Sequence, residues 1–307
     1  MSVRPCNLEV DLGPLRLRNP ILSASGTYGH GLEMRHFTPP ELLGGLVSKT
    51  VTIAPRPGNA APRICETELG LLNSIGLENK GVDHYIANVL PEVASADTMI
   101  IANIGGESPQ EYAEMAAKLG SRPEIDALEV NLSCPNVQGG RIPFGTDPKN
   151  AWGVMVAVRA VTAKPIFAKL SPNVTRIDEM AKAVEDAGAD GITAVNTLLG
   201  MAVDWRTGKP GIATVQGGYS GPAIKPVALR CAWECAKSVS IPVIGCGGIA
   251  SAEDALEYLA VGCRAVQVGT GSFADPALPG KVAAEMLRLL TEAGYSSVAD
   301  FIGSLKA

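Results

Sequence analysis

Several apolar segments of this sequence end in side chains that can bind a ligand or carry charge. These side chains are Ser25, Lys49, Thr50, Asn103, Asn131, Lys169, Asn196 and Thr197. Amide and hydroxyl groups can hydrogen-bond a polar ligand, and ammonium groups stabilise negative charge that develops during a reaction. Any one of them could be an ordinary polar strand end. Two lysines and three asparagines at equivalent places predict a binding site at one rim.

Glycine-containing turns follow the last two of these segments. Gly247-Gly248 comes after one, and Gly269-Thr270 comes after the other. Backbone N–H groups in the loops after strands 7 and 8 of a barrel commonly hold a phosphate, so the turns predict a phosphorylated ligand. Gly245-x-Gly247-x-x-Ala250 also imitates a dinucleotide-binding fingerprint. The next strand ends in Gly269-Thr270 and not in an acidic residue, which disfavours a Rossmann site.

The elements that must position these residues alternate between strands and helices. Short apolar, β-branched runs predict eight strands, at Ile21–Ser23, Gly45–Lys49, Thr98–Asn103, Ala127–Asn131, Pro165–Leu170, Gly191–Asn196, Pro242–Cys246 and Ala265–Gly269. The clearest helical segments are Ser108–Leu119, Lys149–Val161, Arg176–Ala187, Lys225–Ser238, Ser251–Leu259 and Gly280–Ala293. Eight strands alternating with helices predict an α/β fold, the (β/α)8 TIM barrel, as a single domain over residues 1–307.

Three long segments interrupt the alternation. Residues 50–97, 132–148 and 197–224 are rich in glycine, proline or polar side chains and are expected to be long βα loops. In barrel enzymes the loops at the carboxyl ends of the strands build the active site. These insertions are therefore where a substrate pocket and a lid are expected.

Composition narrows the class of protein. The 307 residues are 46% hydrophobic and 19% charged, with a net charge of −5. Clustered Lys and Arg would be needed to bind nucleic acid, so no nucleic-acid partner is expected. The apolar runs are far shorter than the roughly 20 residues that span a bilayer, and the first residues lack a signal-peptide core. The expected location is the cytoplasm, without membrane attachment.

The cysteines favour a reducing compartment. There are seven, an odd number, and no CxxC pair occurs. Cys231 and Cys235 are one helical turn apart without companion ligands, so neither an iron–sulfur cluster nor a structural metal site is expected in this chain. Reduced thiols would then be available for chemistry.

Five motifs carry a resemblance to a known family. They are Asn131-Leu132-Ser133-Cys134-Pro135-Asn136, Asn73-Ser74-Ile75-Gly76-Leu77, Lys169-Leu170-Ser171-Pro172-Asn173, Asn196-Thr197 and Ser220-Gly221-Pro222-Ala223-Ile224-Lys225-Pro226. In this order and spacing, from about Leu8 to the last helix, the chain resembles the class I dihydroorotate dehydrogenases. More narrowly, it resembles their NAD-linked B-type catalytic subunit. The departures are small, with Tyr28, Glu78 and Lys80 standing where relatives often have Phe, Gln and Pro.

The resemblance implies a reaction and a cofactor. The chain would oxidise (S)-dihydroorotate to orotate in pyrimidine biosynthesis, with one FMN per chain as hydride acceptor. A base must then act on one face of the ring while the flavin lies on the other. The implied cofactor-binding residues are Ser25, Lys49, Thr50, Asn103, Asn131, Lys169, Val195, Gly221, Gly247, Gly248, Gly269 and Thr270. Lys169 would approach the flavin N1/O2 edge, and Val195 would contribute backbone only.

Cys134 resembles the family's catalytic base. A free thiol has a pKa near 8.5, and a positively charged neighbourhood, which Lys49 could help to supply, increases the thiolate fraction. The implied substrate-binding residues are Lys49, Asn73, Ser74, Ile75, Gly76, Leu77, Asn131, Asn196 and Thr197. Asn73-Ser74 could also be plain turn residues. The other cysteines, Cys6, Cys65, Cys231, Cys235, Cys246 and Cys263, are expected to be packing residues, and His30, His36 and His84 are given no role.

The resemblance also implies partners and leaves alternatives. A homodimer would join two electron-transfer subunits that carry FAD and a [2Fe-2S] cluster and reduce NAD+, which makes a heterotetramer. The alternatives within the family are an A-type enzyme that reduces fumarate and a dihydropyrimidine dehydrogenase-like enzyme. More remote are a barrel aldolase or isomerase that forms a Schiff base on Lys169, and a non-catalytic flavin or phosphate carrier.

Overall fold

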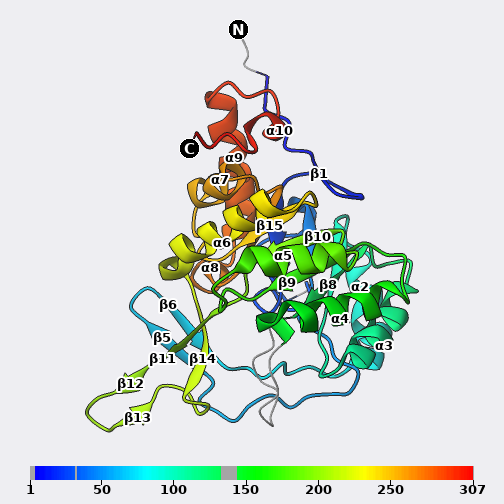
Figure 1. Ribbon diagram of the computed structural model, residues 1–307. Helices are drawn as coiled ribbons and strands as arrows, with labels where there is room; N and C mark the ends of the chain where they lie inside the picture. Colours follow the sequence, from blue (N-terminus) through cyan, green and yellow to red (C-terminus); the bar gives the residue numbers. More distant parts are fainter. Residues whose placement is uncertain (1–3, 32, 133–143, 307) are drawn as a thin grey trace.

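A closed barrel of parallel strands forms the centre of the molecule (Figure 1). The computed structural model describes residues 4–31, 33–132 and 144–306. Within them, eight strands close the barrel in the spatial order β10-β15-β16-β3-β4-β7-β8-β9. Their bounds are β3 Ile21–Ser23, β4 Gly45–Val47, β7 Met99–Ile104, β8 Ala127–Asn131, β9 Ile166–Leu170, β10 Gly191–Ala194, β15 Val243–Cys246 and β16 Ala265–Val268. The predicted (β/α)8 barrel is confirmed.

The barrel strands coincide with the predicted strands within a few residues. All eight are buried along their whole length except for the first residue of β7, which explains why most of their residues are apolar and many are β-branched. The largest difference is at β4 and β10, which end two residues earlier than predicted. The backbone therefore leaves the ladder before Lys49 and Asn196, and the two side chains lie on the rim.

Helices surround the barrel in the expected positions (Figure 1). The long helices are α3 Pro109–Gly120, α4 Pro148–Arg159, α5 Ile177–Asp186, α6 Lys225–Ser238, α7 Ala252–Ala260 and α9 Leu278–Glu292. Short helical segments are η1 Pro40–Leu42, α1 Val82–His84, η2 Tyr85–Val89, α2 Leu90–Val93, η3 Phe144–Thr146, η4 Pro222–Ile224, α8 Gly271–Ala274 and α10 Val298–Phe301. Ser108 caps α3 by accepting from the backbone N of Glu111, and Gly188 takes a φ of 89° just after α5.

The start of α7 resembles a capping box but differs from one in detail. Ser251 accepts a hydrogen bond from the backbone N of Asp254, as such a box requires. The Asp254 carboxylate, however, accepts from the backbone N of Ala250 at 2.8 Å, one residue earlier than a capping box requires. Asp254 thus ties down the loop that precedes the helix.

Two of the predicted long loops contain a sheet that the sequence analysis did not predict. Strands β5 Ile64–Thr67 and β6 Gly70–Asn73 come from residues 50–97, and β11 Leu198–Met201 and β14 Gln216–Ser220 come from residues 197–224. They form an antiparallel sheet in the order β11-β14-β6-β5, called the lid sheet below. A small hairpin, β12 Val203–Asp204 and β13 Lys209–Pro210, extends from it (Figure 1).

The opposite end of the barrel is covered by an N-terminal hairpin. Strands β1 Val10–Leu12 and β2 Leu15–Leu17 pair antiparallel, and their turn lies close to the residues that precede β10 and β15. The barrel is therefore closed at its amino end and faces the lid sheet at its carboxyl end. None of the helices described is both long and apolar enough to cross a bilayer.

Candidate active site

A cavity of about 740 Å³ lies at the carboxyl end of the barrel, below the lid sheet. Its lining includes every described residue that the sequence analysis assigned to the substrate or the cofactor. These are Ser25, Lys49, Thr50, Asn73, Ser74, Ile75, Gly76, Leu77, Asn103, Asn131, Lys169, Val195, Asn196, Thr197, Gly221, Gly247, Gly248, Gly269 and Thr270. Residues that are up to 245 positions apart, from Ser25 to Thr270, thus meet around one space. Cys134 lies outside the described residues.

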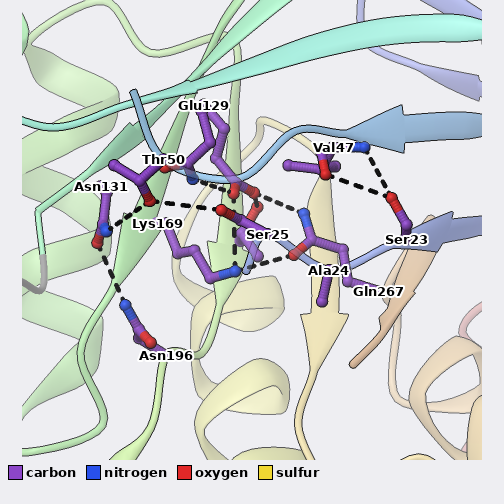
Figure 2. Close-up of polar contacts among 12 residues, drawn as sticks. Ser23, Ala24, Ser25, Val47, Thr50, Glu129, Asn131, Lys169, Asn196 and Gln267 are labelled. Carbon is purple, nitrogen blue, oxygen red and sulfur yellow. Dashed lines mark hydrogen bonds and ion pairs between the residues drawn. The ribbon is translucent and has the colours of Figure 1, made fainter. Parts of the chain in front are cut away.

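The floor of the cavity contains a buried ion pair. Lys169 on β9 is 4% exposed and Glu129 on β8 is fully buried, with the Lys169 Nζ 3.6 Å from the Glu129 Oε1. Gln267, on β16 across the barrel, accepts from Lys169 Nζ at 3.0 Å and donates to Glu129 Oε2 at 2.5 Å. Figure 2 shows these three side chains converging from different strands.

Glu129 is held from two further strands. Asn103 Nδ2 on β7 donates to its Oε1 at 2.6 Å, and Thr193 Oγ1 on β10 donates to its Oε2 at 2.7 Å. Burial alone would lower the pKa of Lys169, but the adjacent Glu129 carboxylate outweighs it and raises that pKa above its ordinary value. Lys169 is therefore a protonated ammonium in the cavity floor.

A row of amide and hydroxyl groups continues from this floor along the rim. Asn196 Nδ2 donates to Asn131 Oδ1 at 3.2 Å, and Asn131 Nδ2 donates to Thr50 Oγ1 at 3.5 Å (Figure 2). Thr50 Oγ1 is also 3.4 Å from Ser25 Oγ. The Oδ1 atom of Asn103 is buried and accepts no hydrogen bond from the described residues. This row can recognise a flat heterocycle through alternating donors and acceptors.

The glycine turns after β15 and β16 form a second part of the lining. Gly247 and Gly248 take φ values of 132° and 72°, which only glycine adopts readily. A Cβ on Gly248 would lie 2.7 Å from the backbone N of Lys225, so no larger residue fits. In the neighbouring turn after β16, Thr270 Oγ1 is 2.8 Å from Ser220 Oγ. Exposed backbone and hydroxyl groups of this kind suit a phosphate.

An ion-paired brace supports the Gly248 turn from behind. Lys225 Nζ contacts the carboxylates of Asp254 at 2.5 Å and Glu257 at 2.9 Å. Burial raises the pKa of Asp254, but the hydrogen bonds from Lys225 and the Ala250 N–H outweigh it, and the net pKa lies below the ordinary value. The Asp254 carboxylate thus binds two neighbours of the turn: Lys225, which lies against Gly248, and the backbone N–H of Ala250.

The lid sheet holds the residues on the far side of the cavity. Asn73 ends β6, and its Nδ2 donates to the backbone O of Gly218 on β14 at 3.3 Å. The next residue, Ser74, donates its backbone N to Arg63 O at 2.8 Å. Arg63 is also ion-paired with Glu78. Asn73-Ser74 are therefore held by pairing between two distant segments and are more than plain turn residues.

The cysteines only partly match their prediction. Cys6, Cys231, Cys235 and Cys263 are buried, as packing residues should be. Cys246, in contrast, lines the cavity at the end of β15, and burial raises the pKa of its thiol despite the nearby Lys169. It is a neutral thiol of the cavity wall, so its prediction as a packing residue alone was incomplete. Cys65, in β5 of the lid sheet, is half-buried. None of the three histidines lines the cavity.

Glu129, Thr193 and Gln267 were missed by the sequence analysis. The available signal was polarity within predicted strands: each of the three interrupts an apolar run of a barrel strand. In a barrel strand the inward-facing positions are ordinarily bulky and apolar. A charged residue two positions before Asn131 could therefore have indicated a buried network.

The fold and the cavity define a (β/α)8-barrel protein with a large cavity at the carboxyl ends of its strands. Residues 7–290 match the family described as dihydroorotate dehydrogenase, and the chain belongs to that family.

Its relatives include proteins named dihydroorotate dehydrogenase B (NAD(+)), catalytic subunit. The one from Trichlorobacter lovleyi is 51% identical over 97% of this chain and 98% of its own length. The ones from Pelobacter propionicus and Geobacter sulfurreducens are 49% and 48% identical, each over 98% of this chain and over 99% and 98% of their own lengths. The similarity thus covers nearly the whole chain.

Proposed function

We propose that this chain is the catalytic subunit of a B-type dihydroorotate dehydrogenase, which oxidises (S)-dihydroorotate to orotate in pyrimidine biosynthesis. The observation that carries the proposal is that one cavity gathers all the described candidate residues of a chain in the dihydroorotate dehydrogenase family. The named relatives support the B-type assignment.

FMN is the proposed cofactor. The residues fit it in three respects: the Gly247-Gly248 and Gly269-Thr270 turns suit its phosphate, the unpartnered buried Oδ1 of Asn103 can accept from a ligand, and Lys169 is a fixed cation. Ser25, Lys49, Thr50, Asn131, Val195 and Gly221 complete the proposed cofactor-binding set. When bound, FMN supplies the acceptor for the hydride that leaves C6 of dihydroorotate.

The remaining groups bind the substrate and move its proton. Asn73, Asn131, Asn196 and Thr197 hydrogen-bond the carboxylate and ring amides, and Lys49 adds positive charge beside them. Ser74, Ile75, Gly76 and Leu77 complete the substrate side under the lid sheet. Cys134 removes the C5 proton as the catalytic base. An ammonium nearby favours the thiolate that this step needs.

The proposed assembly is a homodimer joined to two partner subunits. These would carry FAD and a [2Fe-2S] cluster and pass electrons from FMN to NAD+. The names of the relatives, which contain both "catalytic subunit" and NAD(+), support a division of labour of this kind.

A spectroscopic titration tests the function. The purified chain is expected to be yellow, to bleach when dihydroorotate is added anaerobically, and to recover its colour with NAD+ only when the partner subunit is present. Cys134→Ser is expected to keep FMN and lose turnover. Unchanged turnover would remove Cys134 from its role, and fumarate reduction by the isolated chain at the rate of dihydroorotate oxidation would favour the A-type enzyme.

The aldolase alternative is disfavoured by the cavity floor. A Schiff-base lysine must lose its proton to attack a carbonyl, whereas the pKa of Lys169 is raised beside Glu129. A colourless preparation that cannot be reconstituted with FMN would nevertheless revive that alternative.

A further inference from the structure

Glu129 is a buried charge that no step of the proposed reaction uses. Its carboxylate sits inside the barrel, where side chains from β7, β10 and β16 donate hydrogen bonds to it. Because β8 and β16 stand four positions apart in the ring of strands, its contact with Gln267 crosses the interior. Taking such a carboxylate out of water is costly unless it is paired and hydrogen-bonded, and it has both kinds of contact here.

Gln267 links Glu129 to Lys169 through a hydrogen bond to each. Its amide nitrogen donates to the Glu129 carboxylate and its amide oxygen accepts from the Lys169 ammonium. The opposite orientation would place two donors against each other, so the network permits one amide orientation only. Lys169 is thereby held by two contacts whose geometry Glu129 determines.

Lys169 connects the buried hydrogen-bond network to the cavity. It lines the space as well as contacting the network, so its charge acts on whatever occupies the site. In a low-dielectric interior an ammonium without a counter-charge tends to lose its proton, whereas a carboxylate 3.6 Å away favours the charged form. The charge that a ligand meets therefore depends on Glu129, which lies beneath the cavity lining.

We propose that Glu129 is a positioning residue for Lys169: it keeps the lysine charged and in one place in the cavity floor, and thereby sets the reduction potential of the bound flavin. The inference rests on the proposed function, because it takes a flavin as the occupant. A cation beside the flavin stabilises the negative charge gained on reduction, and the nearby carboxylate moderates that effect.

The neighbourhood of Lys169 makes the proposal testable. Among the described residues, the titratable groups that act on Lys169 include Glu129 from β8 and Cys246 from β15. Gln267, which contacts both Lys169 and Glu129, is neutral, and so are Thr193 and Asn103, which hydrogen-bond Glu129. Replacing Glu129 by glutamine keeps the size of the side chain and removes the carboxylate that contacts the lysine.

The test measures the midpoint potential of the FMN-loaded chain at pH 9. Glu129→Gln is expected to lower the potential below that of the wild type, toward the value of Lys169→Gln, because desolvation then leaves the lysine neutral. Glu285→Gln is the matched control: it makes the same change of side chain and charge in α9, outside the cavity lining, so it should follow the wild type. A Glu129→Gln potential equal to or above that of the wild type would overturn the proposal.

A second measurement applies even if the single variant folds poorly. Glu129→Gln should lower the midpoint temperature of unfolding because buried Lys169 loses its counter-charge, and the double variant Glu129→Gln/Lys169→Gln should recover much of that loss. Purely additive losses would overturn the pairing. This cycle needs no flavin, so a chain that binds none would refute the proposed function while the cycle still tests the pair.

Discussion

The barrel interior and the lid sheet both supply residues to the cavity, but they hold them by different means. Glu129, Lys169 and Gln267 extend from strands whose backbones are locked in parallel ladders, and all three side chains are nearly or fully buried. The lid sheet joins two distant segments through antiparallel pairs such as Gly218 with Asn73, and many of its side chains are exposed.

This difference separates two tasks. The barrel interior can maintain a fixed charge because its groups are buried and linked by many hydrogen bonds. The lid sheet has fewer buried contacts, so it can adjust to a substrate at lower cost. We therefore expect changes in the interior to affect stability and flavin properties, and changes in the lid sheet to affect substrate binding.

The strongest test of this contrast is Glu129→Ala. Removing the carboxylate leaves Lys169 buried without its counter-charge, which should lower the free energy of unfolding by about 3–5 kcal/mol. Denaturant unfolding measures the loss. Glu66→Ala, on an exposed position of the lid sheet, should change it by less than about 0.5 kcal/mol. Similar losses for both variants would erase the distinction between the two regions.

A glycine substitution tests the lid sheet. A Cβ on Gly217 would lie 2.5 Å from the backbone O of Asn73, so Gly217→Ala must push β14 away from β6. We expect the KM for dihydroorotate to rise about tenfold, equivalent to roughly 1.4 kcal/mol, with FMN content unchanged. Steady-state kinetics measure it. Gly153→Ala, in α4 with open space around its Cα, should leave KM unaltered, and a normal KM in Gly217→Ala would argue against a substrate role for Asn73.

The brace behind the Gly248 turn should respond to acid. Because the pKa of Asp254 is lowered in the folded chain, its stabilisation is present above the unfolded pKa of about 3.9 and is lost as pH falls through the folded value. The midpoint temperature of Asp254→Asn should therefore fall less between pH 5 and pH 3 than that of the wild type. Asp186→Asn, at an exposed position, should follow the wild-type curve. Identical curves for all three proteins would rule out the brace.

The smallest effect on stability is expected at the Arg63–Glu78 pair, whose residues lie just before β5 and a few residues after β6 of the lid sheet. Both side chains are partly exposed, at 29% and 44%, so Arg63→Ala should cost less than about 1 kcal/mol of stability. Chemical denaturation with and without 0.5 M NaCl measures the effect. A loss of stability above about 2 kcal/mol would mean that contacts next to the lid sheet stabilise the fold as strongly as those of the barrel interior.

Much of the cavity could be predicted from sequence because barrel geometry is regular. Once the strands are placed, their carboxyl ends must share one rim, so residues such as Asn103 and Lys169 were expected to meet although they are far apart in the chain. Asn73 could be assigned only through a resemblance, because nothing in residues 50–97 indicates its strand partner. Antiparallel pairing between separate loops depends on contacts that a local pattern does not record.

The sequence alone determined the class of fold, the strand positions and the polar rim, because periodicity and strand-end residues are local properties of the chain. Only the tertiary structure decided that Glu129 pairs with Lys169 through Gln267, and that two loops combine into the lid sheet. The reason is physical: the pairing crosses a closed barrel, and the energy of a buried charge depends on which partners the fold brings within a few ångströms of it.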